Sequence, residues 1–180
     1  MINIRTGRLT VRLARPDDAE AIYSYRSDFI ENKYQGWFPY SEQEVRDYMA
    51  SMPQTLDVAG VCFQFAIVEV DTDRLIGDMA VIFTNHDLMQ VEVGCTLDKN
   101  FQGKGYAAEA LKAMVNHLFI ELKKHRVIAS VDPRNTASIR LVERLGFRKE
   151  AHFKESYYLR GEWVDDVIFA LLRKEWIDIE

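Results

Sequence analysis

The stretch Gln102-Gly103-Lys104-Gly105-Tyr106-Ala107-Ala108 decides how the rest of this sequence is read. It follows a short run with strand character and precedes a long segment whose apolar residues recur at helical spacing. Two glycines at a helix start let the backbone turn its N–H groups outward, because no Cβ atom obstructs them. Those free N–H groups and the positive end of the helix dipole form a seat for an anion, most often a phosphate or pyrophosphate. The stretch therefore predicts a phosphorylated cofactor.

The composition narrows the class of protein. At 180 residues the chain has the size of one domain, and we expect that domain to span residues 1–180. The net charge of -5 argues against a nucleic-acid partner, since such proteins usually carry a basic excess. No apolar run approaches the roughly 20 residues of a membrane span, and the first residues lack the apolar core of a signal peptide. Cys62 and Cys95 lie in apolar runs and indicate free thiols in a reducing, cytoplasmic compartment.

Cationic residues gather around and after the glycine segment, although the chain as a whole is acidic. They are Lys104, Arg134, Arg140, Arg144, Arg148 and Lys149. A polyanionic cofactor would be held by such local groups. The four histidines show no metal-ligand spacing, so no metal site is predicted.

Hydrophobic periodicity and turn signals predict an α+β domain. Helices are expected from Pro16 to about Phe29, from Ser41 to about Met52, from the glycine segment to Leu122, and over Thr136–Leu145. Strands are expected at Thr10–Ala14, Cys62–Val70, Leu75–Phe83, Gln90–Leu97, Arg126–Val131, Phe147–Tyr158 and Val164–Leu172. The second, third and fourth of these strands, joined by short turns that include Asn85-His86-Asp87, imply an antiparallel meander. The fourth strand, the helix after the glycine segment and the strand Arg126–Val131 form one crossover, which implies one pair of parallel neighbours.

Three interpretations of the glycine segment compete. The first is a helix start with convenient glycines and no ligand. The second is a dinucleotide fingerprint, because residues 103–108 fit G-x-G-x-x-A and Asp132 closes the next strand. That fingerprint needs a doubly wound parallel sheet, whereas a meander precedes the segment here. The third interpretation uses motifs spread over the whole chain.

These motifs resemble those of the GNAT superfamily of N-acyltransferases. Gln102, Gly105 and Ala107 meet the signature (Q/R)-x-x-G-x-(G/A) of its motif A, after the strand-like run Val91–Asp98. Asn135-Thr136-Ala137-Ser138 and Leu145-Gly146-Phe147 are similar to its N-x-x-S…L-G-F block. Gly161-Glu162-Trp163-Val164-Asp165-Asp166 is similar to the G-x-W-x-D segment of the RimJ/RimL-like branch, and Thr6–Arg12 resembles the first strand of that branch. Four motifs in the right order cover nearly the whole chain.

The resemblance implies a single GNAT-like domain. Its mixed, mostly antiparallel sheet would be split by a cofactor cleft and would carry helices on both faces. Acetyl-CoA would lie between the strands Gln90–Leu97 and Arg126–Val131, and its pantetheine arm would pair with the backbone like an added strand. The residues implied to bind the cofactor are Cys95, Thr96, Leu97, Gln102, Gly103, Lys104, Gly105, Tyr106, Ala107, Asn135 and Ser138.

The same resemblance implies transfer of an acetyl group from a thioester to a primary amine. Glu92 is the candidate base that removes the ammonium proton, and an N–H near Cys95 is the candidate oxyanion donor. Ser138 is the candidate acid toward the CoA sulfur, or at least a hydrogen-bond donor to it. Val142 stands where many relatives have a tyrosine, which leaves Ser138 or water to supply the proton. Structural roles stay open for Glu92 as a strand carboxylate and Ser138 as a helix-start residue. Asn135 is also a natural N-cap.

The acceptor is less well specified. An aromatic loop should line its channel, and Trp37, Tyr40 and Glu92 are the candidate substrate-binding residues. An acidic protein suits a cationic acceptor, either a protein N-terminus or a small amine such as an aminoglycoside or polyamine. A module that binds acyl-CoA without turnover is a further alternative, and Cys95 leaves a covalent route conceivable. We expect a monomer or homodimer without nucleic-acid or membrane partners.

Overall fold

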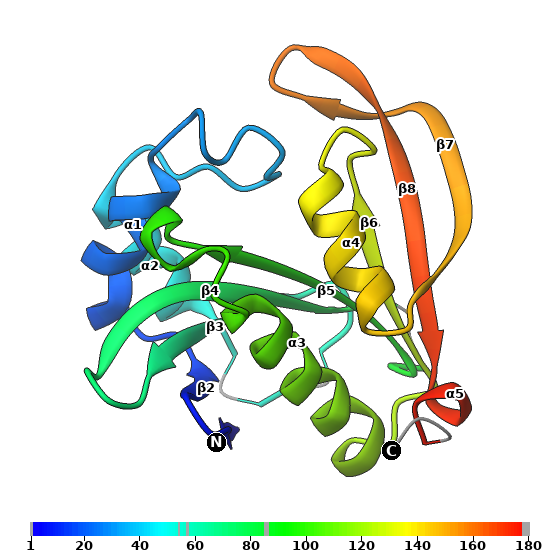
Figure 1. The fold of residues 1–180 in the computed structure, drawn as a ribbon. Helices are drawn as coiled ribbons and strands as arrows, with labels where there is room; N and C mark the ends of the chain where they lie inside the picture. The colour runs from blue at the N-terminus through cyan, green and yellow to red at the C-terminus, as the bar shows by residue number, and fades with distance from the viewer. Residues whose placement is uncertain (1, 54, 57, 85–86, 178–180) are drawn as a thin grey trace.

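One twisted sheet organises the computed structural model, which describes residues 2–53, 55–56, 58–84 and 87–177 (Figure 1). Its eight strands lie in the order β1-β2-β3-β4-β5-β6-β8-β7. They are β1 (Asn3–Arg5), β2 (Leu9–Leu13), β3 (Cys62–Glu69), β4 (Arg74–Phe83), β5 (Gln90–Leu97), β6 (Arg126–Val131), β7 (Arg148–Leu159) and β8 (Glu162–Leu172). Every neighbouring pair is antiparallel except β5 and β6, so the predicted α+β class and its mostly antiparallel sheet are confirmed.

Helices cover both faces of the sheet. The α1 helix (Ala19–Arg26) and α2 (Glu42–Ser51) pack on one face, where their apolar residues join Ala66 and Val68 of β3. The α3 helix (Tyr106–Asn116) and α4 (Thr136–Arg144) pack on the other face in the larger core. Alternation along β3 explains the division, because Phe65 and Ile67 point into the larger core. A short α5 (Arg173–Ile177) follows β8.

Local side-chain chemistry sets where several elements begin and end. Ser41 caps α2 as predicted, with its hydroxyl accepting from the Glu44 amide at 3.1 Å. The first helix was expected to reach Phe29, but α1 ends at Arg26. Asp28 accepts hydrogen bonds from the amides of Ile30 and Glu31, which favours a turn over a further helical coil.

Two other boundaries differ from the sequence prediction. The strand predicted at Thr10–Ala14 is β2, shifted by one residue to Leu9–Leu13, and residues 6–8, which the family resemblance included in a first strand, form the turn between β1 and β2. The α3 helix ends at Asn116 and continues as one π-helical turn, His117–Glu121, before β6. In the predicted turn at residues 85–87, Asn85 and His86 lie outside the described residues.

The parting of β5 and β6 is the feature that positions the site. The two strands pair in parallel at only three positions, Gln90 with Arg126, Val91 with Val127 and Glu92 with Ile128. Beyond Glu92, β5 keeps β4 as its neighbour and β6 keeps β8. The edge of β5 from Val93 to Leu97 that faces β6 therefore has no strand partner.

Candidate active site

The glycine segment forms an exposed turn that leads into α3. Gly105 is the N-cap residue, and Gly103 and Gly105 have φ values of 74° and 82°, a backbone region that favours glycine. Among the described residues, none accepts a hydrogen bond from the backbone N–H groups of residues 103–108. No side chain caps the helix start either. The arrangement offers several backbone donors and the positive end of a helix dipole to an anion.

Neighbouring side chains hold this turn in place. Gln102 donates from Nε2 to the Leu97 carbonyl at 3.1 Å, which ties the turn to the end of β5. Arg8 donates from Nη1 to the Lys104 carbonyl at 3.1 Å and from Nε to Glu109 Oε2 at 2.7 Å. Thr6 also donates to Glu109, at 2.6 Å. The turn between β1 and β2 therefore holds the first turn of α3 in place. The backbone N–H groups of residues 103–108 stay directed toward solvent.

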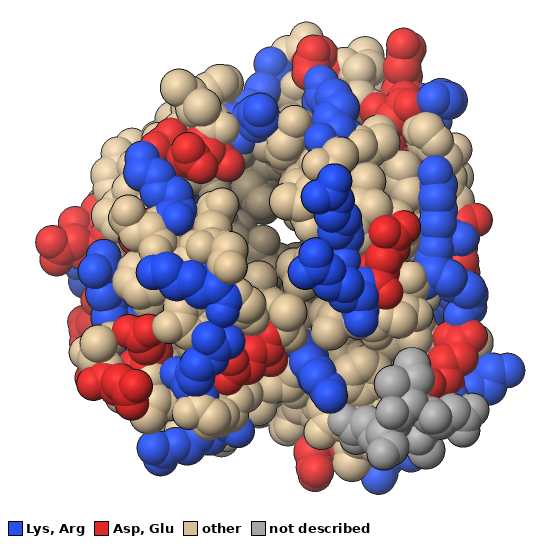
Figure 2. All heavy atoms as spheres, viewed as in Figure 1, with Lys and Arg blue, Asp and Glu red and all other residues tan. Residues whose placement is uncertain are grey.

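An outer groove runs from this turn to α4. It is lined by every residue that the sequence assigned to cofactor binding except Lys104: Cys95, Thr96, Leu97, Gln102, Gly103, Gly105, Tyr106, Ala107, Asn135 and Ser138. The Lys104 ammonium instead lies 5.2 Å from the centre of the Phe101 ring. Arg140 and Arg144 of α4 line the groove as well, and Figure 2 shows cationic side chains on both sides of a central hollow. This distribution fits a ligand that carries several phosphates.

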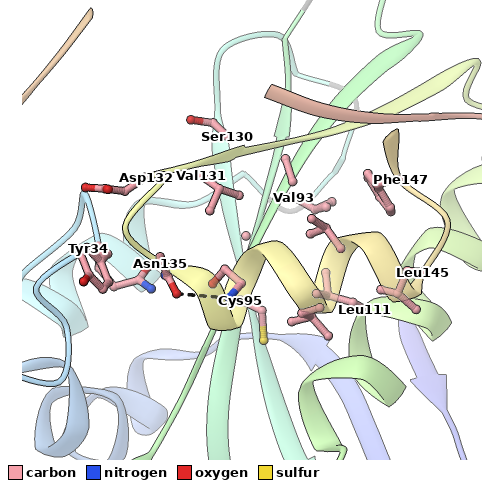
Figure 3. Close-up of a pocket in the computed structure, with 16 residues that line it drawn as sticks. Tyr34, Val93, Cys95, Leu111, Ser130, Val131, Asp132, Asn135, Leu145 and Phe147 are labelled. Carbon is pink, nitrogen blue, oxygen red and sulfur yellow. Dashed lines mark hydrogen bonds between the residues drawn. The ribbon is translucent and has the colours of Figure 1, made fainter. Parts of the chain in front are cut away.

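An inner pocket continues from the groove to the place where β5 and β6 part (Figure 3). Gly94 and Cys95 line it from β5, Ser130 from β6, and Ser138 from α4. The Asn135 side chain accepts from the Ser138 amide at 3.1 Å, so Asn135 is the N-cap of α4 as expected. Within the described part of the chain, the Ser138 hydroxyl makes no hydrogen bond. Val142 lines the pocket with a buried apolar side chain, which leaves no hydroxyl at that position.

Glu92 and Ser138 lie on opposite sides of the parted sheet. Alternation along β5 puts Val93 and Cys95 toward α4 and Glu92 toward the face of α1. Burial and, to a smaller extent, the charge of Asp166 raise the pKa of the Glu92 carboxyl. Asp166 is fixed by Ser130, whose hydroxyl donates to it at 2.7 Å. A half-buried carboxyl group with a raised pKa is typical of residues that exchange protons in active sites.

The Cys95 thiol has a different character. Burial, followed by the charge of Asp78, raises its pKa to about 12. A thiol with that pKa stays protonated at neutral pH and is a poor nucleophile. Its position in the inner pocket is suited to packing against a ligand.

A buried ion pair lies beneath β5 on the α1 face. The Arg26 guanidinium donates from Nε and Nη2 to the two Asp78 oxygens at 2.9 Å and 2.6 Å, and Arg26 and Asp78 are 4% and 0% exposed. Nη2 also donates to Thr96 Oγ1 at 3.2 Å, and Nη1 to the Trp37 carbonyl at 3.1 Å. Arg26 thus links α1, the free half of β5 and the loop of residues 27–41. No local sequence pattern signals this pair, because its members are 52 residues apart.

The aromatic loop meets the pocket with residues other than those expected. Tyr34 and Gln35 line both the groove and the inner pocket. Trp37 packs edge-on against Tyr48 at 5.2 Å and under Arg26, and Tyr40 is 86% exposed. Neither Trp37 nor Tyr40 lines the groove or the inner pocket, so their role in acceptor binding stays a prediction.

Within the described ranges, no helix has the length and apolar character needed to cross a membrane. In the same part of the chain, no group of three or more His, Cys, Asp or Glu side chains is placed to hold a metal ion.

Known proteins match the chain over most of its length. Residues 8–148 match the family described as acetyltransferase (GNAT) domain. The uncharacterized N-acetyltransferase p20 of Bacillus licheniformis is 31% identical, covering 98% of this chain and 99% of its own. The [ribosomal protein uS5]-alanine N-acetyltransferase of Escherichia coli is 29% identical, covering 97% and 93%.

A solved structure gives the same answer for the fold. A GNAT-family acetyltransferase from Bacillus anthracis superposes with a TM-score of 0.85 at 29% identity, covering 97% of this chain and all of the other. The separation of β5 and β6, the unpaired backbone N–H groups before α3 and these matches all point to the same family. The chain belongs to the GNAT acetyltransferase family and is an N-acetyltransferase that uses acetyl-CoA.

Proposed function

We propose that this N-acetyltransferase acetylates a protein N-terminal α-amine by direct attack of the amine while both substrates are bound. The observation that carries the proposal is the gap between β5 and β6, with Glu92 on one side and Ser138 on the other. An amine that enters from the face of α1 meets Glu92. A thioester that enters from the groove meets Ser138. The two reactants therefore come together in the gap.

Acetyl-CoA fits the residues present. The backbone N–H groups of residues 103–108 would hold its pyrophosphate, and Arg140 and Arg144 would add positive charge. The free edge of Val93–Leu97 would pair with the amides of the pantetheine arm. The bound molecule supplies an activated acetyl group as a thioester.

The side chains then divide the proton transfers between them. Glu92 takes a proton from the acceptor ammonium, and its raised pKa brings it closer to the pKa of an α-amine, roughly 7.7–8.0. The amine nitrogen forms the C–N bond while a backbone N–H near Cys95 faces the developing oxyanion. As the C–S bond breaks, the Ser138 hydroxyl would donate its proton to the sulfur and would take up the second proton of the attacking nitrogen. Ser138 is thereby restored, and the products are the amide and the thiol of CoA. The high pKa of Cys95 argues against an acetyl-cysteine intermediate.

An α-amine acceptor is supported by the relative from E. coli, whose name states that it acetylates an alanine of ribosomal protein uS5. The alternatives are a small amine and a module that binds acyl-CoA without turnover. A panel assay separates them, with acetyl-CoA thioester loss measured on an alanine-initiated decapeptide, spermidine and kanamycin. We expect the peptide to have the highest kcat/KM. A preference for spermidine or kanamycin would favour small amines, and binding of acetyl-CoA without turnover on any amine would favour the module.

A further inference from the structure

Two segments from opposite ends of the chain meet beside the active site. They are the loop of residues 27–41, which joins α1 to α2, and the turn between β7 and β8. Arg160 in that turn donates from Nη2 to the Asn32 carbonyl at 2.9 Å and from Nη1 to the Phe29 carbonyl at 3.4 Å. Its guanidinium also lies over two rings of the loop, 4.4 Å from the centre of Phe29 and 4.9 Å from that of Phe38. One side chain therefore holds both limbs of the loop.

The groups that Arg160 grips are themselves fixed. Asn32 is buried, and its side-chain amide donates to the carbonyls of Tyr25 at 2.6 Å and Asp28 at 2.9 Å. Phe29 and Phe38 pack edge to face at 5.9 Å. Asn32 therefore ties the loop to the end of α1, and Arg160 contacts the loop on both sides of Asn32.

Further contacts join the loop to the same hairpin. Arg134 donates to Glu162 at 3.0 Å and lies 5.8 Å from the centre of the Tyr34 ring. At Gly36, an added Cβ would come within 2.6 Å of the Tyr157 hydroxyl, so the loop backbone packs directly against β7. In Figure 1, the loop stands above α1 and the tip of the hairpin stands above α4, both at the top of the view.

Under the proposed function, this assembly borders the space in which the amine and the thioester would meet. Tyr34 and Gln35 of the loop line the inner pocket together with Gly94 and Ser130. Glu92 is two residues before Gly94 and points to the same face of β5. In Figure 3, Tyr34 lies at one end of the pocket beside Asn135. The loop joins α1 to α2 on the face of the sheet toward which Glu92 points, so an acceptor that approached Glu92 from that face would pass close to the loop.

We infer that Arg160 is a specificity-determining residue, which clamps the 27–41 loop over the acceptor entrance and admits slender, unbranched primary amines. The inference rests on the proposed function and sharpens it. An extended peptide N-terminus passes beneath the loop, whereas an amine on a sugar ring or a folded surface needs the loop to move. Lysine would not replace Arg160, because two carbonyls and two rings are engaged by one planar guanidinium.

The test compares Arg160→Ala and Arg160→Lys with the wild-type chain and with Lys154→Ala. Lys154 is a matched control, since it is a cation on the same hairpin whose ion pair, to Asp165 at 2.8 Å, does not involve the loop. We measure kcat/KM for an alanine-initiated decapeptide and for kanamycin, and acetyl-CoA affinity by calorimetry. Arg160→Ala should lower the peptide-to-kanamycin ratio about tenfold. Acetyl-CoA affinity should not change, and Lys154→Ala should behave like the wild type.

A second readout does not depend on activity. Chymotrypsin should cleave the aromatic loop faster in Arg160→Ala than in the wild type or Lys154→Ala. Equal cleavage rates, an unchanged substrate ratio, or a wild-type preference for kanamycin would each overturn the inference. Absence of turnover on every amine would instead refute the proposed function, and the cleavage rates would still decide whether the clamp exists.

Discussion

In the proposed function, the two sides of the cleft recognise their ligands with different parts of the chain. The cofactor side presents backbone groups from the nearly continuous run 93–108, namely the free edge of β5 and the bare amides before α3. The acceptor side presents side chains from segments far apart in sequence, including Tyr34, Glu92, Asp166 and Arg160. Backbone recognition tolerates most side-chain changes but depends on the glycines. Side-chain recognition lets a few substitutions alter the acceptor while the cofactor site is retained.

Arg26 joins the two sides. It donates hydrogen bonds to Thr96 on β5 and to the Trp37 carbonyl in the loop of residues 27–41, while Asp78 balances its charge. Substitutions on the cofactor side, on the acceptor side and at Arg26 should therefore have effects of different kind and size.

The largest effect should come from Gly105→Glu on the cofactor side. A side chain at φ 82° costs about 1–2 kcal/mol, and a carboxylate placed against a diphosphate adds several kcal/mol of repulsion. Acetyl-CoA affinity should therefore fall by about a thousandfold or more, as measured by calorimetry, while the fold persists.

Lys104→Glu is the matched control for that change. It alters charge more strongly at the adjacent position, but the Lys104 side chain lies over Phe101 outside the groove. If Lys104→Glu weakens binding as much as Gly105→Glu, long-range charge and not the backbone seat explains the affinity.

Arg26→Met should have the next largest effect, on stability. Removing one partner of a buried ion pair leaves the other charge uncompensated and typically costs about 3–5 kcal/mol. Urea unfolding should show that loss. Arg46→Met, which breaks the exposed pair with Glu42, should cost about 1 kcal/mol or less. Similar losses in the two variants would show that the buried pair does not stabilise the link between the two sides.

The cofactor side could be predicted from sequence because the residues that form it lie close together along the chain. Glycines at the start of a helix have a direct backbone consequence, and residues 102–108 carry it in one run. Strand alternation and a single crossover then placed β5 beside β6. The short length of their pairing was implied only by the family resemblance, since no residue in either strand signals where pairing stops.

The acceptor side could not be predicted in the same way. Arg160 reads as a turn residue, and its partners Phe29 and Asn32 lie more than 120 residues earlier. Tyr34 was one of several aromatic residues in its loop, and the structure alone shows that it lines the pocket while Tyr40 points to solvent. Such contacts depend on how β7 and β8 are placed at the edge of the sheet, which no local pattern encodes.

Glu92→Gln tests the chemistry on the acceptor side. Loss of a general base should lower the rate at pH 7 by about a hundredfold, because the acceptor amine is then mostly protonated. The deficit should shrink above pH 8, where an α-amine loses its proton without help. Rates measured from pH 6 to pH 9.5 with saturating acetyl-CoA provide the check. A deficit of the same size at every pH would assign Glu92 a structural role.

Asp166→Asn should have the smallest effect and is the sharpest test of how Glu92 is tuned. Burial is the larger cause of the raised pKa of Glu92, and the charge of Asp166 is the smaller one. Asparagine keeps an oxygen for the Ser130 hydroxyl but removes the charge, so the pKa of Glu92 should fall. Because the base works when deprotonated, the acidic limb of the kcat/KM profile should move to lower pH.

Asp165→Asn gives the matched control for this last change. The neighbouring carboxylate has different partners, Lys154, His152 and the Glu155 amide, and these hydrogen bonds hold its pKa well below the usual range. Its loss should leave the acidic limb where it is. An unmoved limb in Asp166→Asn would mean that burial alone sets the pKa of Glu92. Equal movement in both variants would mean that the net charge of the hairpin, and not the position of one carboxylate, governs the base.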